Sequence, residues 1–109
     1  MASTSEKPRV ARMVEDVVGC KWSLSVLALV RSGVVRPGAM QRSTAGLTTK
    51  VLNERLAKMM RFGILEKRSF PEIPPRVEYR LTPFGWKLVQ ILDHIDALQE
   101  EVSGPGGVP

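Results

Sequence analysis

The chain has 109 residues, of which 43 % are hydrophobic and 25 % are charged, and its net charge is +5. This length fits one domain, and the composition is that of a globular protein rather than of a disordered or fibrous one. No apolar run approaches the about 20 residues of a membrane-spanning helix, and the N-terminus lacks the apolar core of a secretory signal. A single cysteine, Cys20, excludes an internal disulfide. We therefore expect a cytoplasmic protein without membrane association.

Charge is distributed unevenly along the chain. Residues 36–80 contain ten Lys or Arg and four Glu, whereas residues 81–109 contain one Lys and four acidic residues. A basic segment followed by an acidic one predicts one face that binds a polyanion. Charge alone leaves open the alternative of a solvated basic surface that binds no partner.

The first third of the chain predicts two helices. Residues 1–8 are polar and are expected to be flexible. The helix that follows, ending near Gly19, has one apolar face, which is made of Val10, Met13, Val14, Val17 and Val18. Residues 22–30 are more uniformly apolar and predict a buried helix, with Trp22 in the core. Residues 34–36 are expected to form a very short strand.

The middle of the chain has the pattern of a helix-turn-helix. Residues 39–44 are long enough for a helical turn or two, and Ala45 and Gly46 form the turn. Residues 49–62 carry an apolar helical stripe, with Thr48 or Thr49 as the N-cap and a glycine after the last turn.

A β-hairpin and a long helix follow. Two short runs, 64–70 and 76–81, flank a proline-rich turn and predict a hairpin with a stiff tip. Thr82 and Pro83 then begin a helix as its N-cap and first residue, and residues 103–109 are expected to be a flexible tail. The whole is mostly α with a small β-hairpin, a winged helix-turn-helix domain over residues 9–102.

This order of elements predicts DNA binding. The helix at about 49–62 would enter the major groove, and the wing at 66–81 would contact the backbone or the minor groove. The candidate DNA contacts are the outward polar and basic side chains of these elements: Arg42, Thr49, Lys50, Asn53, Lys58, Lys67, Arg68 and Arg76. Asparagine pairs with adenine and lysine with guanine, and either binds phosphate. The alternative is a winged-helix protein-interaction module without specific DNA binding, which would not need these cations.

Several segments together resemble the HxlR family of bacterial transcription regulators, which are relatives of the MarR winged-helix proteins. They are Gly19-Cys20-Lys21-Trp22, Leu47-Thr48-Thr49-Lys50-Val51-Leu52, Gly63-Ile64-Leu65-Glu66-Lys67-Arg68, Pro71-Glu72-Ile73-Pro74-Pro75-Arg76-Val77-Glu78-Tyr79 and Leu81-Thr82-Pro83-Phe84-Gly85. The resemblance spans about residues 10–98. It implies a cytoplasmic, nucleoid-associated regulator that dimerises through its terminal helices and binds double-stranded DNA at a palindromic operator.

The sequence departs from the family pattern at two places. The family usually has Arg-Phe-x-Glu-Leu where this chain has Arg36-Pro37-Gly38-Ala39-Met40. Redox-sensing members carry a cysteine near the position of Arg9 or Val10, and this chain has none there. The first departure changes the start of the helix before the turn, and the second argues against thiol sensing.

The last helix predicts a homodimer. Its apolar stripe runs for about five turns at 3.6 residues per turn, more than the core of so small a domain covers, and a two-fold copy is the commonest way to bury such a stripe. Trp86 is a further candidate for this interface. The expected dimerisation residues, on the first and last helices, are Val10, Met13, Val14, Leu88, Ile91, Leu92, Ile95 and Leu98.

No catalytic set is present, so we expect neither an enzyme nor a cofactor. His94 is the only histidine and has no partner at metal-ligand spacing. Cys20 lies beside Lys21, which could lower a thiol pKa; we interpret it as a small, partly buried residue rather than a sensor. Whether a small-molecule effector acts on the protein is left open.

Overall fold

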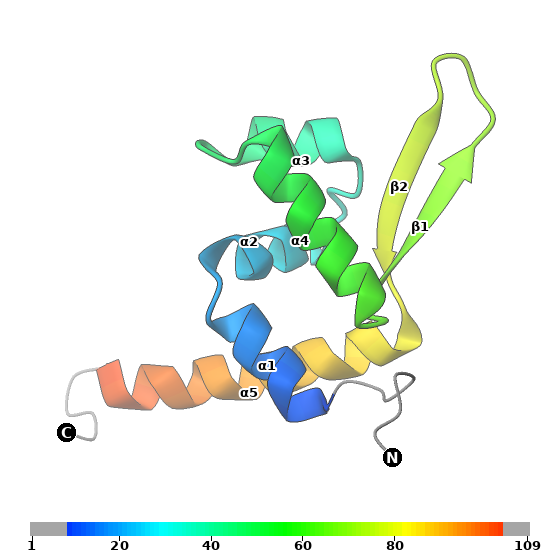
Figure 1. The fold of residues 1–109 in the computed structure, drawn as a ribbon. Coiled ribbons are helices and arrows are strands. Elements are labelled where there is room, and N and C mark those ends of the chain that lie inside the picture. The colour runs from blue at the N-terminus through cyan, green and yellow to red at the C-terminus, as the bar shows by residue number, and fades with distance from the viewer. Residues whose placement is uncertain (1–8, 104–109) are drawn as a thin grey trace.

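The computed structural model describes residues 9–103 and confirms the predicted order of five helices and one hairpin (Figure 1). The elements are α1 (Val10–Val18), α2 (Lys21–Arg31), α3 (Pro37–Ser43), α4 (Thr49–Arg61), β1 (Leu65–Phe70), β2 (Arg76–Leu81) and α5 (Pro83–Ser103). Ser103, expected in the tail, is the last residue of α5. The segments 1–8 and 104–109, predicted to be flexible, lie outside the described residues.

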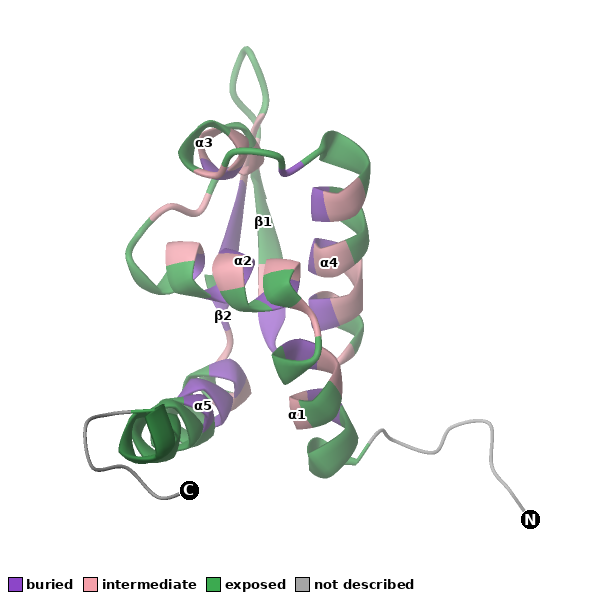
Figure 2. Cartoon of the chain, turned by 90° about the vertical axis from the view of Figure 1, so that its left-hand side faces the viewer, coloured by how far each residue is buried: buried purple, intermediate pink, exposed green. Residues whose placement is uncertain are grey.

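One hydrophobic core joins α2, α4, the hairpin and the first half of α5. Its most deeply buried side chains, each with an exposed fraction of 0–1 %, include Val26, Met40, Leu52, Leu56, Ile64 and Leu88. Buried residues line the inner sides of these elements (Figure 2). Burying one such side chain contributes about 1.5–3 kcal/mol, so this cluster fixes the orientation of α4. Trp22 packs against it, half-buried, as predicted.

Both ends of α4 are capped. The Thr48 side chain accepts a hydrogen bond from the backbone N–H of Val51 at 3.2 Å, so Thr48 is the N-cap. At the other end Gly63 has a φ of 77°, in the left-handed region that glycine enters without penalty, and the Ile64 N–H donates to the Met59 carbonyl at 2.9 Å. The chain therefore turns directly from α4 into the hairpin.

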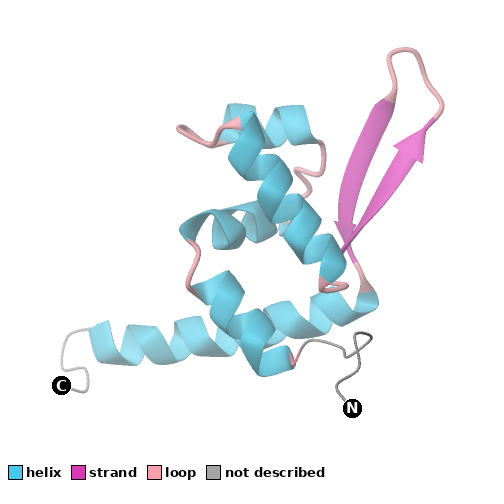
Figure 3. Ribbon diagram, viewed as in Figure 1, coloured by secondary structure: helices cyan, strands magenta, loops and turns pink. Residues whose placement is uncertain are grey.

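The hairpin is a two-stranded antiparallel sheet that extends away from the helical body (Figure 3). Its register pairs Leu65 with Leu81 at the base and Phe70 with Arg76 near the tip. The predicted strand at 34–36 is wrong. The Tyr79 N–H donates to the Val35 carbonyl at 2.8 Å, but α3 begins at Pro37, whose missing N–H prevents a longer ladder. Proline suits the first position of a helix, because its φ is already helical and no N–H is needed there, so α3 begins at Pro37 rather than at residue 39.

The start of α5 is locked onto the junction between α4 and β1. Thr82 is its N-cap, as predicted: its hydroxyl accepts from the Gly85 N–H at 2.9 Å and donates to the Gly63 carbonyl. Gly85 is required by close approach, since a Cβ there would lie 2.2 Å from the backbone carbonyl oxygen of Ile64. Beyond Leu92, every residue of the helix is exposed. The helix therefore has a buried half and a free half.

Candidate nucleic-acid interface

The first turns of α4 present a polar surface. Thr49, Lys50 and Asn53 are all exposed there, at the end of α4 that lies beside α3 (Figure 1). Gln41 on α3 donates to the Thr49 hydroxyl at 3.0 Å and lies 3.4 Å from the Leu47 carbonyl. This side-chain bridge fixes the turn between the two helices, so the exposed end of α4 has a defined orientation.

Lys58 does not join this surface. It lies eight residues after Lys50, about 12 Å further along the helix at 1.5 Å per residue. Its ammonium group is 3.2 Å from the Asp16 carboxylate on α1 and lies over the ring of Phe62. Its role is to tie α4 to α1. The helical pattern could not identify this pair, because the partner is 42 residues away in the sequence.

Arg76 is held within the hairpin, whereas Lys67 and Arg68 are exposed on β1. The Arg76 guanidinium lies 3.1 Å from Glu72 across the tip and 4.0 Å from the centre of the Phe70 ring. It therefore braces the wing, and we leave it out of the proposed DNA contacts. The sequence carried the signal for this role, since Glu72 stands four residues before Arg76.

Glu78 is a buried carboxylate surrounded by arginines. The hydrogen bond from Arg80, at 2.9 Å, is the main cause that lowers the pKa of Glu78. The positive charges of Arg80, Arg76 and Arg36 lower this pKa further. The charge of one carboxylate thus interacts with three guanidinium groups, so the local charge around Glu78 in β2 stays positive.

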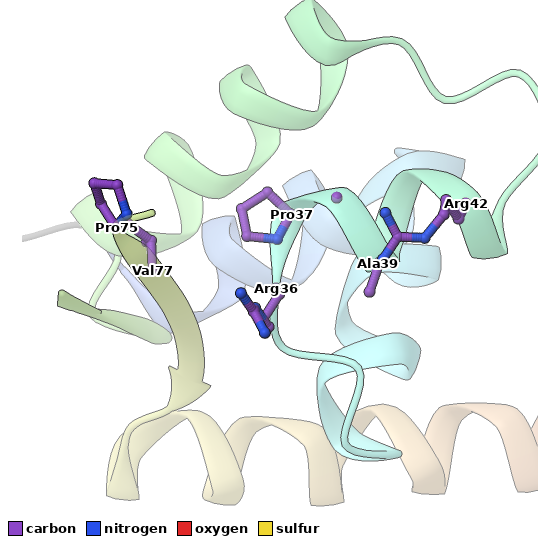
Figure 4. Close-up of a pocket in the computed structure, with 7 residues that line it drawn as sticks. Arg36, Pro37, Ala39, Arg42, Pro75 and Val77 are labelled. Atoms are coloured by element: carbon purple, nitrogen blue, oxygen red, sulfur yellow. The ribbon is translucent and has the colours of Figure 1, made fainter. Parts of the chain in front are cut away.

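A hollow of about 380 Å³ lies between the start of α3 and the wing (Figure 4). Two arginines border it, Arg36 just before α3 and Arg42 in its last turn. The rest of the lining comes from residues without charged side chains: Pro37, Gly38, Ala39, Pro75 and Val77. Arg42 was a predicted DNA contact; Arg36 was not, because its position before the helix carried no periodic signal.

The predicted dimerisation residues divide into two groups. Met13, Leu88 and Leu92 are only 6 %, 1 % and 6 % exposed because they pack inside the chain, so they are not available to a partner. Four other side chains of the set are exposed: Val10, Ile91, Ile95 and Leu98. Val14 is partly buried. Trp86 is also exposed. Periodicity identified an apolar stripe but not which neighbour covers each part of it.

Cys20 is half-buried at the junction of α1 and α2, as expected. Burial raises the pKa of its thiol, but hydrogen bonds from Ser23 and Trp22 and the charge of Arg55 outweigh that effect, so the pKa is lowered. The Arg55 guanidinium donates to the sulfur at 3.4 Å. These contacts fasten the α1–α2 junction to α4.

Within residues 9–103, no three His, Cys, Asp or Glu side chains gather closely enough to hold a metal ion. None of the helices described there combines the length and the hydropathy needed to cross a membrane.

Known proteins resemble this chain over most of its length. A helix-turn-helix-type transcriptional regulator from Synechocystis, itself uncharacterised, is 39 % identical over 79 residues, which cover 72 % of this chain and 58 % of that protein. The match thus spans less than two thirds of this relative.

Two crystal structures share the fold. One is assigned to the MarR family of transcriptional regulators, from Enterococcus faecalis V583; it has a TM-score of 0.75 and 35 % identity and covers 91 % of this chain and 90 % of that one. Another of the same assignment, from Porphyromonas gingivalis W83, has a TM-score of 0.68 and 32 % identity and covers 93 % and 97 %. Residues 17–105 match the model of the family described as "HxlR-like helix-turn-helix", and the chain belongs to that family.

Proposed function

We propose that this protein is a DNA-binding transcription regulator whose α4 enters the major groove while its wing contacts the adjacent backbone or minor groove. The observation that carries the proposal is the exposed, polar first end of α4, with Lys50 and Asn53 held in a fixed orientation beside α3. An α-helix fits the major groove, and its first turns commonly contact the base edges. On this proposal the protein acts in the cytoplasm, on the nucleoid, and catalyses no reaction.

The charge of the surface supports a polyanionic partner. Within residues 9–103, neither Lys50, Arg42 nor Lys67 has an ion-pair partner, so their charges remain available. Arg68 is partly neutralised by Glu66 at 3.1 Å. Lys50 and Asn53 are the proposed base contacts, and the other cations bind phosphate. A protein-interaction module would not require this arrangement of free cations.

We further propose that the protein acts as a homodimer. Ile91, Ile95 and Leu98 are 43 %, 37 % and 62 % exposed and lie on one side of α5, where the body of the chain does not cover them. A two-fold copy would bury the same stripe on both chains, together with Val10 of α1. Two copies of α4 would then meet successive major grooves about 34 Å apart on a palindromic site.

Selection of bound duplexes from a random pool tests both parts of this proposal. We expect an inverted repeat to be recovered, with binding that weakens as salt rises because counterions are released from the phosphates. A pool that shows no enrichment, with no retention of random duplex at low salt, would refute DNA binding and favour the protein-interaction module. A recovered site without symmetry would refute the dimer on DNA.

A further inference from the structure

The hollow between α3 and the wing contains two arginines whose charges are not paired. Among residues 9–103, no carboxylate lies within ion-pair distance of Arg36 or Arg42. Arg36 influences the carboxylate of Glu78, but that carboxylate is already bonded to Arg80 at 2.9 Å and lies 3.7 Å from Arg76. The hollow therefore has an excess of positive charge.

Both arginine side chains are exposed and border the same hollow. Arg42 extends back along α3 toward Arg36 (Figure 4). Gly38 leaves room for this path, since a Cβ there would lie only 3.3 Å from Nη1 of Arg42. Pro37, Pro75 and Val77 supply no side-chain hydrogen-bond acceptor. Two positive charges on one hollow, neither with a carboxylate partner, attract an anion.

The position of the hollow identifies the anion. It lies between α3, which is bonded to the exposed end of the α4 helix that we place in the major groove, and the hairpin that we place beside the minor groove. The DNA strand that separates two neighbouring grooves must pass between these two elements. Guanidinium groups bind phosphate through two parallel N–H···O bonds. We propose that Arg36 and Arg42 together hold one phosphodiester group of that strand, which sets the depth and angle at which α4 enters the groove.

This inference rests on the proposed function, and salt-dependent binding tests it. The Arg36→Ala/Arg42→Ala variant is compared with the wild type on the selected operator and on random duplex. Arg9→Ala/Arg12→Ala, which removes the same charge from exposed positions at and before α1, is the matched control. We expect the slope of log Kobs against log[salt] to fall by about 1 per protomer in the first variant. Affinity should fall by about tenfold on both duplexes alike, whereas the control should change neither.

Neutral phosphates provide a second readout. In a methylphosphonate scan of the operator, one substituted position per half-site should weaken the wild type but leave the Arg36→Ala/Arg42→Ala variant unchanged, since its clamp is already lost. Arg36→Lys/Arg42→Lys should retain the salt slope while losing affinity, because it keeps the charges but not the two-bond geometry. Unchanged thermal unfolding establishes that each variant is folded.

The outcomes distinguish the two proposals. If the wild type binds duplex but the double alanine variant matches its control in slope and affinity, the phosphate clamp is overturned while the proposed function stands. The same holds if the scan weakens wild type and variant equally at every position. If the wild type binds no duplex, the proposed function fails and the clamp fails with it.

Discussion

The first turns of α4 and the second half of α5 each present a side that the rest of the chain does not cover, but the chemistry of the two surfaces is opposite. The α4 surface presents hydroxyl, ammonium and amide groups, from Thr49, Lys50 and Asn53. The α5 surface presents aliphatic side chains, such as Ile95 and Leu98, with acidic residues on its other sides. The first fits a polyanion and the second fits another apolar surface, so the chain carries two separate binding surfaces.

The two helices are nevertheless built on the same plan. Each has buried residues that fix its direction and exposed residues that present a surface. In α4 the buried residues include Leu56 and Met59, and in α5 they include Leu88 and Val89, all 1 % exposed. A small domain can thus orient an exposed surface by burying other residues of the same helix. Five experiments test this comparison.

The largest effect is expected from Ile95→Asp/Leu98→Asp. Charges on the apolar stripe should prevent dimerisation, and operator affinity should fall by at least a hundredfold because one protomer binds only a half-site. The protomer should remain folded, since both positions are exposed. Sedimentation and operator binding measure the two effects. Ala97→Asp, on the opposite side of α5, is the control; a wild type that is monomeric at micromolar concentration yet binds a palindrome tightly would contradict the dimer.

Gly85→Ala should disturb the scaffold rather than either surface. Its Cβ would lie 2.2 Å from the Ile64 carbonyl oxygen, which is backbone and cannot rotate away. Overpacking of this kind costs about 2–3 kcal/mol of unfolding free energy, measurable by urea denaturation. Gly38→Ala meets only the end of a flexible side chain and serves as the control. Equal stability of Gly85→Ala and the wild type would show that α5 is not held as described.

Lys50→Ala and Lys58→Ala contrast the two halves of α4. The first should weaken specific binding by about 1–3 kcal/mol if Lys50 contacts a base, with unchanged stability. The second removes the pair with Asp16 and should cost less than about 1 kcal/mol of stability, with little change in operator affinity. Competition binding and denaturation separate the effects. Normal operator affinity in a folded Lys50→Ala variant would remove this lysine from the interface.

Acid should weaken the wing. The arginines lower the pKa of Glu78 below its ordinary value, so the stability that this carboxylate contributes is present above its unfolded pKa of about 4.3. It is lost as pH falls through the lower folded pKa. Glu78→Gln should reduce stability at pH 7 and flatten the acid limb of the stability curve. An identical pH dependence for wild type and variant would contradict the prediction.

The smallest effect is expected at Cys20, at the junction of α1 and α2. A single cysteine cannot form an internal disulfide, and the sulfur contacts Arg55 rather than the exposed end of α4. Mild oxidant should therefore leave operator affinity unchanged in gel-shift titrations. Release of DNA that disappears in Cys20→Ser would contradict this and link the α1–α2 junction to DNA binding.

The sequence predicted the helices, the hairpin and the exposed end of α4, because local spacing, caps and turn residues specify them. It did not predict ion pairs between distant elements, such as Lys58 with Asp16. It also treated Leu92 as an interface residue, although this side chain is only 6 % exposed. Periodicity reports that a side chain is apolar but not whether its own chain or a second copy covers it. The sequence did not identify Arg36 as a candidate contact, because the hollow that it borders forms only when α3 and the wing are brought together.

The close packing at the start of α5 fixes the direction of the whole helix. The helix is continuous from Pro83 to Ser103, and Gly85 leaves its first turn no room to shift against the Ile64 carbonyl. In the proposed dimer, the angle between the two copies of α5 therefore determines the relative orientation of the two copies of α4. If base pairs were inserted at the centre of the operator, the protein could not bend to follow the change. The DNA would have to twist instead, so the stiffness of the unread central base pairs would become part of what the regulator recognises.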